Sequence, residues 1–71
     1  MYKTMFSLFL ELLTKKKVSR LDLAEKLYIS EKTVSRYISH LIADGVPIIS
    51  MTGRGGGYEL DGAYIATLKR F

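Results

Sequence analysis

The sequence of 71 residues contains no cysteine, one proline and a single histidine, His40. Without cysteine the chain cannot form a disulfide, a thiolate metal site or a cysteine nucleophile, and nothing points to secretion. A zinc site would need carboxylates for almost all of its ligands, so we expect neither a bound metal nor a cofactor. The length allows one domain, but it leaves no room for a dinucleotide-binding βαβ unit beside a substrate site.

Long hydrophobic runs are also missing. The most apolar stretch, residues 5–13, is interrupted by Ser7 and Glu11 and is far too short to cross a bilayer. It lacks the strongly basic start and the small-residue cleavage site of a secretory signal. We therefore expect no membrane partner and a cytoplasmic location.

Acidic residues are fewer than basic ones. Seven Asp and Glu stand against eleven Lys and Arg, which gives a net charge of +4. The excess lies in residues 15–36, with seven basic and three acidic residues, and the rest of the chain is close to neutral. A basic segment on a small domain indicates a polyanionic partner, with nucleic acid favoured over a membrane surface. A surface that only keeps the protein soluble is the alternative.

Residues 3–16 have the pattern of an amphipathic helix with a wide apolar face. The apolar arc covers about 200°, whereas a surface helix needs only about 100°. One apolar stripe consists of Phe6, Phe9, Leu10 and Leu13. A second stripe beside it consists of Met5, Leu8 and Leu12. The core needs only one stripe, so the other is either covered elsewhere in the chain or forms a dimer face, and we assign the dimer face to the second stripe.

Two further helices follow, and each begins with a capping signal. Ser19 is followed three residues later by an acid, as in a capping box, and Ser30 with Glu31 repeats the design. Only Tyr28 and Ile29 separate the first of these helices from the cap of the second. Two helices joined by so short a turn must cross at a large angle, which is the helix-turn-helix arrangement.

The third helix is expected to run from Glu31 to about Asp44, with Gly45 as its stop. Its apolar residues lie within an arc of about 140° and form the predicted core face. They are Val34, Tyr37, Ile38, Leu41 and Ile42. The opposite face has no acid and no large apolar residue, and it carries Lys32, Thr33, Arg36, Ser39 and His40.

The remainder of the chain changes to a β pattern. Residues 46–51 are rich in branched and apolar side chains, and residues 58–61 alternate with period two. The segment between them has four glycines and Arg54, which predicts a hairpin loop. A nucleotide-binding loop is not indicated, because no third glycine stands at the required spacing and no helix follows. Residues 62–71 are expected to pack back as a short helix or a strand.

Two consecutive segments of the sequence resemble known DNA-binding regulators. Residues 21–45, LDLAEKLYISEKTVSRYISHLIADG, resemble the helix-turn-helix of bacterial transcription regulators of the deoxyribonucleoside-repressor, WYL-domain and biotin-repressor types. Residues 46–60, VPIISMTGRGGGYEL, resemble the wing that follows in the WYL-type group. The two segments together are considerably more specific than either one alone.

The resemblance implies a mainly α fold with a small β-hairpin, a winged helix-turn-helix of three helices and a two- to three-stranded wing. The domain would span residues 1–61, with residues 62–71 as a tail or the start of a linker. Two positions depart from the group: Tyr28 replaces a common Gly, and Tyr37 replaces a frequent Asp. A left-handed turn would cost Tyr28 roughly 1 kcal/mol. At Tyr37 the departure removes a carboxylate that could orient Arg36.

The predicted function is that of a bacterial or phage transcription regulator that binds double-stranded DNA. The third helix would enter the major groove, and the wing would lie on the backbone or in the minor groove. The predicted DNA-contacting residues are Arg20, Ser30, Glu31, Lys32, Thr33, Ser35, Arg36, Ser39, His40 and Arg54. A repressor that occupies its operator as a homodimer fits this size.

Other functions remain open beside this one. One alternative is a protein-interaction module whose first helix docks a partner protein. Another is the DNA-binding head of a larger regulator with a ligand-sensing effector domain. No catalytic residues are expected. Ser39 and His40 are successive positions on one helix and point in different directions, so together with Asp44 they cannot act as a triad.

Overall fold

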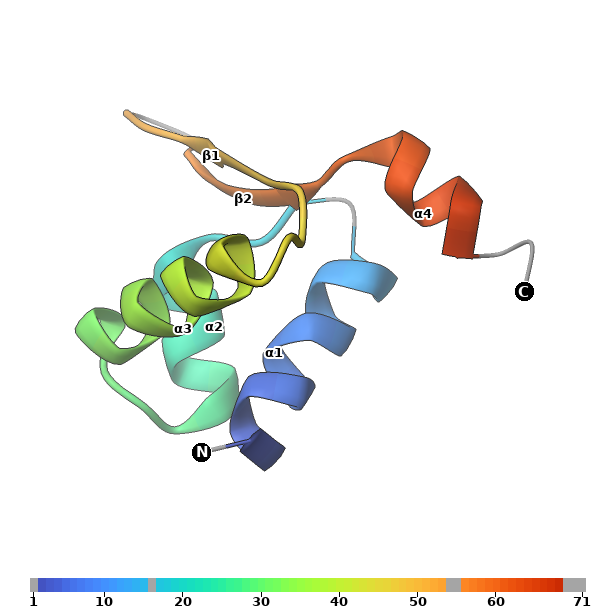
Figure 1. Cartoon of the computed structure of the whole chain (residues 1–71). Coiled ribbons are helices and arrows are strands. Elements are labelled where there is room, and N and C mark those ends of the chain that lie inside the picture. Colours follow the sequence, from blue (N-terminus) through green and yellow to red (C-terminus); the bar gives the residue numbers. More distant parts are fainter. Residues whose placement is uncertain (1, 16, 54–55, 69–71) are drawn as a thin grey trace.

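Four helices and one β-hairpin make up the residues that the computed structural model describes, namely 2–15, 17–53 and 56–68 (Figure 1). In chain order the elements are α1 Tyr2–Thr14, α2 Arg20–Leu27, α3 Glu31–Ala43, β1 Ile48–Met51, β2 Gly57–Leu60 and α4 Gly62–Leu68. Figure 1 shows α1, α2 and α3 grouped together, with the hairpin along one side and α4 beyond it. The predicted fold, a mainly α winged helix-turn-helix, is confirmed.

Side-chain caps begin α2 and α3. The Oγ of Ser19 accepts a hydrogen bond from the backbone N–H of Asp22 at 3.0 Å, and the Oγ of Ser30 accepts one from Thr33 at 3.1 Å. The helix α3 ends shortly before Gly45, which has a φ of +96°, a backbone conformation that favours glycine. Because these contacts are local, the residue pattern predicts both helix starts and the end of α3 to within a residue.

The turn between α2 and α3 places a tyrosine in a conformation that usually needs glycine. Tyr28 has φ 57° and ψ 44°, and its backbone N–H donates to the carbonyl of Ala24. Ile29 donates to the same carbonyl at 3.0 Å. The side chain of Tyr28 is 95% exposed, so packing does not offset the strain. The replacement of glycine by Tyr28 therefore leaves the left-handed turn in place, at a cost of roughly 1 kcal/mol.

Within the described residues, one isolated β-bridge joins the hairpin to the segment between α1 and α2. β1 and β2 pair antiparallel, with Ile48 opposite Leu60. Val18, which lies between α1 and α2, bridges Tyr58 of β2 through two backbone hydrogen bonds of 3.0 and 2.7 Å. A Cβ at Gly57 would lie 2.7 Å from the carbonyl oxygen of Val18, so the close approach requires glycine there. The third strand of the wing is thus reduced to one residue.

The core is built from α1, α2, α3 and β2. The side chains without exposed surface are Leu8, Leu12, Leu23 and Val34. Tyr37, Ile38 and Leu60 are also buried. On the predicted core face of α3, Leu41 is only half-buried and Ile42 is exposed, because these residues lie towards the end of the helix where less of the core covers it.

The prediction that the second stripe of α1 forms a dimer face is wrong. Met5, Leu8 and Leu12 form the stripe that packs in the core, and Leu8 and Leu12 have no exposed surface. The exposed part of α1 belongs to the other stripe, where Phe6 is 61% and Leu10 is 42% exposed. The two stripes are equally apolar and adjacent, so helical periodicity cannot tell which one the other helices cover.

The tail forms a helix rather than a strand. The carboxylate of Asp61 accepts a hydrogen bond from the backbone N–H of Ala63 at 2.8 Å, which begins α4. Tyr64 and Ile65 are half-buried against the core, and no residue of α4 is fully buried. Among the described residues, no helix has the length and apolar character needed to cross a membrane.

We expect Leu8→Ala to lower the free energy of unfolding by about 2–4 kcal/mol, because it removes a fully buried side chain and leaves a cavity. Leu10→Ala on the exposed stripe is the control and should cost about 1 kcal/mol or less. Urea unfolding followed by circular dichroism measures both. Equal losses in the two variants would contradict the assignment of the buried stripe.

The strained turn supports a second prediction. Tyr28→Gly should raise the free energy of unfolding by up to about 1 kcal/mol, because the relief of left-handed strain exceeds the added entropy of glycine in the unfolded chain. Tyr28→Ala keeps a Cβ and should give no such gain. A lower stability for the glycine variant than for the alanine variant would show that Tyr28 is not strained.

Candidate nucleic-acid interface

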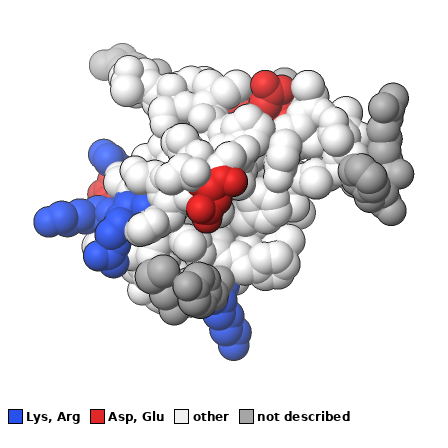
Figure 2. Space-filling model, in the orientation of Figure 1, with Lys and Arg blue, Asp and Glu red and all other residues white. Residues whose placement is uncertain are grey.

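One face of α3 is buried and the opposite face is open to solvent. Lys32, Arg36, Ser39 and His40 are exposed, and Thr33 is half-buried. Figure 2 shows several Lys and Arg side chains gathered at one edge of the molecule, over the start of α3, while the rest of the face in view carries acidic groups and one further basic side chain among uncharged residues. Four of the predicted residues of α3, namely Lys32, Arg36, Ser39 and His40, therefore share one exposed surface.

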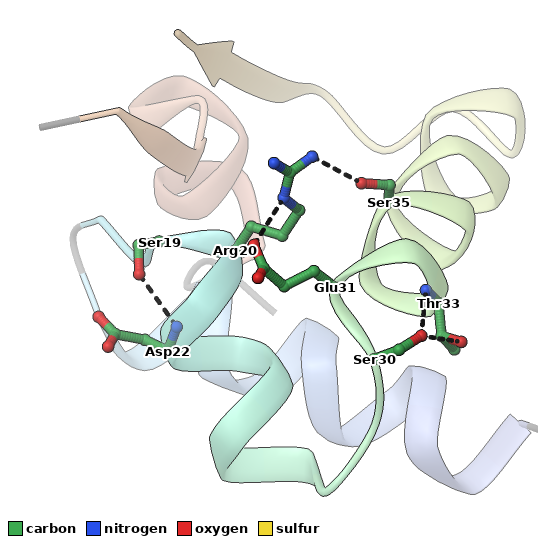
Figure 3. Close-up of polar contacts among 7 residues, drawn as sticks. All are labelled: Ser19, Arg20, Asp22, Ser30, Glu31, Thr33 and Ser35. Carbon is green, nitrogen blue, oxygen red and sulfur yellow. Dashed lines mark hydrogen bonds and ion pairs between the residues drawn. The ribbon is translucent and has the colours of Figure 1, made fainter. Parts of the chain in front are cut away.

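The start of α3 uses two of the predicted residues for its own structure. The hydroxyl of Ser30 accepts from the Thr33 N–H and also lies 2.9 Å from the Oγ1 of Thr33. Both side chains are thus engaged with each other at the cap (Figure 3). Both residues stabilise the beginning of the helix. Thr33 also has a smaller exposed fraction than Lys32 and Arg36, so less of its side chain is available to a ligand.

Arg36 lies at the centre of the exposed face of α3. Its guanidinium carbon lies 6.0 Å from the centroid of the Tyr37 ring, and Tyr37 itself is buried. At this distance a cation–π contact is weak, about 0.5–1 kcal/mol at an exposed site. The ring that lies beside Arg36 belongs to Tyr37, the position at which the regulators that this sequence resembles often have an aspartate.

A polar bridge links α2 to α3 beside this face. The Nε of Arg20 donates to the Oε1 of Glu31 at 3.2 Å, and its Nη1 donates to the Oγ of Ser35 at 3.3 Å. Figure 3 shows the Arg20 side chain extending from the start of α2 across to α3. About half of each charged side chain is exposed, 53% for Arg20 and 50% for Glu31, so the pair adds only about 0–1 kcal/mol to stability.

Arg20 also borders a hollow of about 320 Å³ that separates it from the hairpin. The other lining residues all belong to the hairpin and its loop: Ser50, Met51, Thr52, Gly53, Gly56, Gly57 and Tyr58. Arg54, the predicted wing contact, lies outside the described residues. The structure therefore brings the start of α2 and the loop end of the hairpin to the two sides of one hollow.

Some basic residues of the 15–36 segment lie apart from this face. Glu11 of α1 pairs with Lys15 at 3.0 Å and approaches Lys26 to 4.0 Å. The carboxylate side chain is only 18% exposed, so it offsets these positive charges close to the protein surface. In the part of the chain that the structure describes, no group of three or more potential metal ligands comes together.

The predicted site residues thus fall into three groups. The exposed face of α3 contains Lys32, Arg36, Ser39 and His40. Arg20, Glu31 and Ser35 form the bridge. Ser30 and Thr33 form the cap. The bridge and the hollow were not predicted, because Arg20 and Ser35 are 15 positions apart and no sequence spacing indicates their contact.

Comparison with known proteins supplies one further finding. A family model described as an HTH domain matches residues 6–59. The match extends from α1 to β2 and includes the helix-turn-helix as well as the hairpin. No curated protein and no solved structure matches the chain.

Proposed function

Because the chain belongs to the HTH domain family of DNA-binding domains, we propose that it is a bacterial or phage transcription regulator that recognises a specific double-stranded DNA sequence. The observation that carries the proposal is the exposed face of α3. Its cationic and polar side chains, Lys32, Arg36, Ser39 and His40, project away from a buried opposite face. An α-helix fits the major groove, where side chains reach base edges.

The side chains on this face suit distinct contacts. Arg36 has the donor geometry to bind guanine O6 and N7 at the same time. Lys32 is a compact cation suited to a phosphate, and Ser39 can donate to a phosphate or to a base. The hairpin would follow the DNA backbone or the minor groove, with Arg54 as its contact. A protein with these contacts acts where the DNA is, which in a bacterium is the cytoplasm.

We infer repression by occupancy of an operator, with two copies of the chain on two half-sites. A small recognition module gains contacts by pairing through a two-fold axis. The surface that supports pairing is the exposed stripe of α1, where Phe6 and Leu10 remain uncovered. Phe6 also borders an apolar hollow of about 230 Å³ at the junction of α1 with the end of α3.

The same stripe supports a second candidate function, a protein-interaction module in which a partner protein covers Phe6 and Leu10. Salt dependence separates the two functions. A DNA-binding protein releases counterions, so its affinity for duplex DNA falls steeply as salt rises. An interaction module would show weak binding to DNA or none.

Arg36→Ala should reduce affinity for the operator by about 1–3 kcal/mol, and it should affect random duplex DNA much less, because the contact is to a base. Arg54→Ala should weaken binding to both DNAs by a similar factor. If Arg54 contacts a phosphate, the slope of log affinity against log salt should fall by about one unit. Fluorescence anisotropy at several salt concentrations measures both variants.

Stability provides the control for this comparison. Arg36 is exposed on α3, so Arg36→Ala should leave the unfolding midpoint nearly unchanged. Operator affinity that stays at the wild-type value in the folded Arg36→Ala variant would refute its base-reading role. Arg54→Ala with unchanged affinity and slope would refute the wing contact alone.

Self-association has its own test. Phe6→Glu should give a folded monomer at concentrations where the wild type sediments as a dimer, because it places a charge at the most exposed apolar residue of the stripe. Leu21→Glu is the matched control, since Leu21 is a similarly exposed apolar residue on α2, and it should leave the dimer intact. A wild type that is monomeric at high micromolar concentration in sedimentation experiments would refute the pairing.

A further inference from the structure

We propose that Arg20 binds one phosphate of the DNA backbone at the hollow beside the hairpin, and that Glu31 is a positioning residue that holds Arg20 in place for this contact. The proposal rests on the DNA-binding function proposed above. It gives a role in DNA binding to Glu31, although the negative charge of Glu31 would by itself repel phosphates. The supporting observations are the Arg20 bridge, the hollow that it borders, and the exposure of the pair.

Two of the three nitrogens of the Arg20 guanidinium make a hydrogen bond within the protein. Of its five N–H groups, one on Nε donates to Glu31 and one on Nη1 donates to Ser35. Within the described residues the remaining three have no protein acceptor. Figure 3 shows the contacts to Glu31 and Ser35 leaving the guanidinium in different directions, with no contact drawn to the second terminal nitrogen. The free donors are therefore available to an acceptor that approaches from outside, and a phosphate with several oxygens suits such a planar donor group.

The hollow beside Arg20 has room for that acceptor. Its volume is about 320 Å³, roughly ten times the share of one water molecule in the liquid. On the far side lie the exposed residues Ser50 and Thr52, whose hydroxyls can donate to the same phosphate. A strand of DNA that follows α3 towards the wing would place its backbone across this space.

Glu31 could influence DNA binding in two opposite ways. As an acid near the DNA, it would repel phosphates, and its removal would strengthen binding. As the anchor of Arg20, it would restrict a long side chain with many rotamers before DNA arrives, and its removal would weaken binding. Because the carboxylate contacts the guanidinium at 3.2 Å, its charge is already compensated locally, and we infer that anchoring dominates.

The experiment compares substitutions of Glu31 by anisotropy with a random-sequence DNA duplex, using the whole chain at several salt concentrations. Glu31→Ala removes both the charge and the acceptor, and it should weaken binding roughly two- to tenfold. Glu31→Gln removes the charge but keeps an oxygen acceptor, so it should recover most of the lost affinity. Glu25→Ala is the charge control, since Glu25 is an exposed acid on α2 without a contact to Arg20 among the described residues, and it should not weaken binding.

Substitution of the arginine completes the test. Arg20→Ala should weaken binding and lower the salt slope by about one unit, as expected for one lost phosphate contact. In the Arg20→Ala background, Glu31→Ala should cause no further loss, because the residue that it positions is gone. Circular dichroism and urea unfolding confirm that each variant is folded.

The outcomes separate this inference from the proposed function. A wild-type protein without salt-dependent affinity for duplex DNA would overturn both. A wild type that binds DNA, together with an Arg20→Ala variant of equal affinity and slope, would overturn the phosphate contact alone. Tighter binding by both Glu31→Ala and Glu31→Gln would show that Glu31 acts only by repulsion and would overturn its positioning role.

Discussion

The burial of one face of α3 is the constraint on which the rest of the structure depends. Val34, Tyr37 and Ile38 are buried in the core, so α3 cannot rotate about its axis without exposing them. Its orientation in turn determines that Lys32 and Arg36 face solvent. A rigid helix with one packed face presents its other face in a defined direction, which is what insertion into a groove of DNA requires.

The hairpin is oriented by a second, smaller constraint. The bridge between Val18 and Tyr58 is the backbone connection of β2 to the segment that leads into α2, and the missing side chain of Gly57 makes it possible. Leu60 anchors the far end of β2 in the core. The wing is therefore held at both ends of β2, and this arrangement places its loop end opposite Arg20 across the hollow.

The protein has more basic than acidic residues, but several of its basic side chains form ion pairs with an acid. Glu11 offsets Lys15 and Lys26 at the surface of α1 and α2, and Glu31 contacts Arg20 beside α3. Among the described residues, the net positive segment thus contains cations that pair with an acid and two exposed cations of α3, Lys32 and Arg36, that form no ion pair. Because exposed ion pairs add little stability, these acids matter more for where the positive potential lies than for the fold.

Features that depend on neighbouring residues could be predicted from the residue pattern. The caps at Ser19 and Ser30, the end of α3 at Gly45 and the existence of the hairpin arise from hydrogen bonds and backbone preferences within a few positions. The resemblance of residues 21–60 to known regulators added the winged arrangement. The family match confirms the helix-turn-helix, and the structure shows the hairpin that follows it.

Which apolar stripe of α1 is buried depends on the packing of the whole domain. Leu8 and Leu12 are buried because the other helices and β2 pack on that side. Only the tertiary structure decided that residues 62–68 are helical and that Arg20 meets Glu31 and Ser35. Each of these outcomes depends on segments far apart in the chain. A residue pattern records what a segment prefers by itself, whereas the contacts between segments depend on how all of them share one small core.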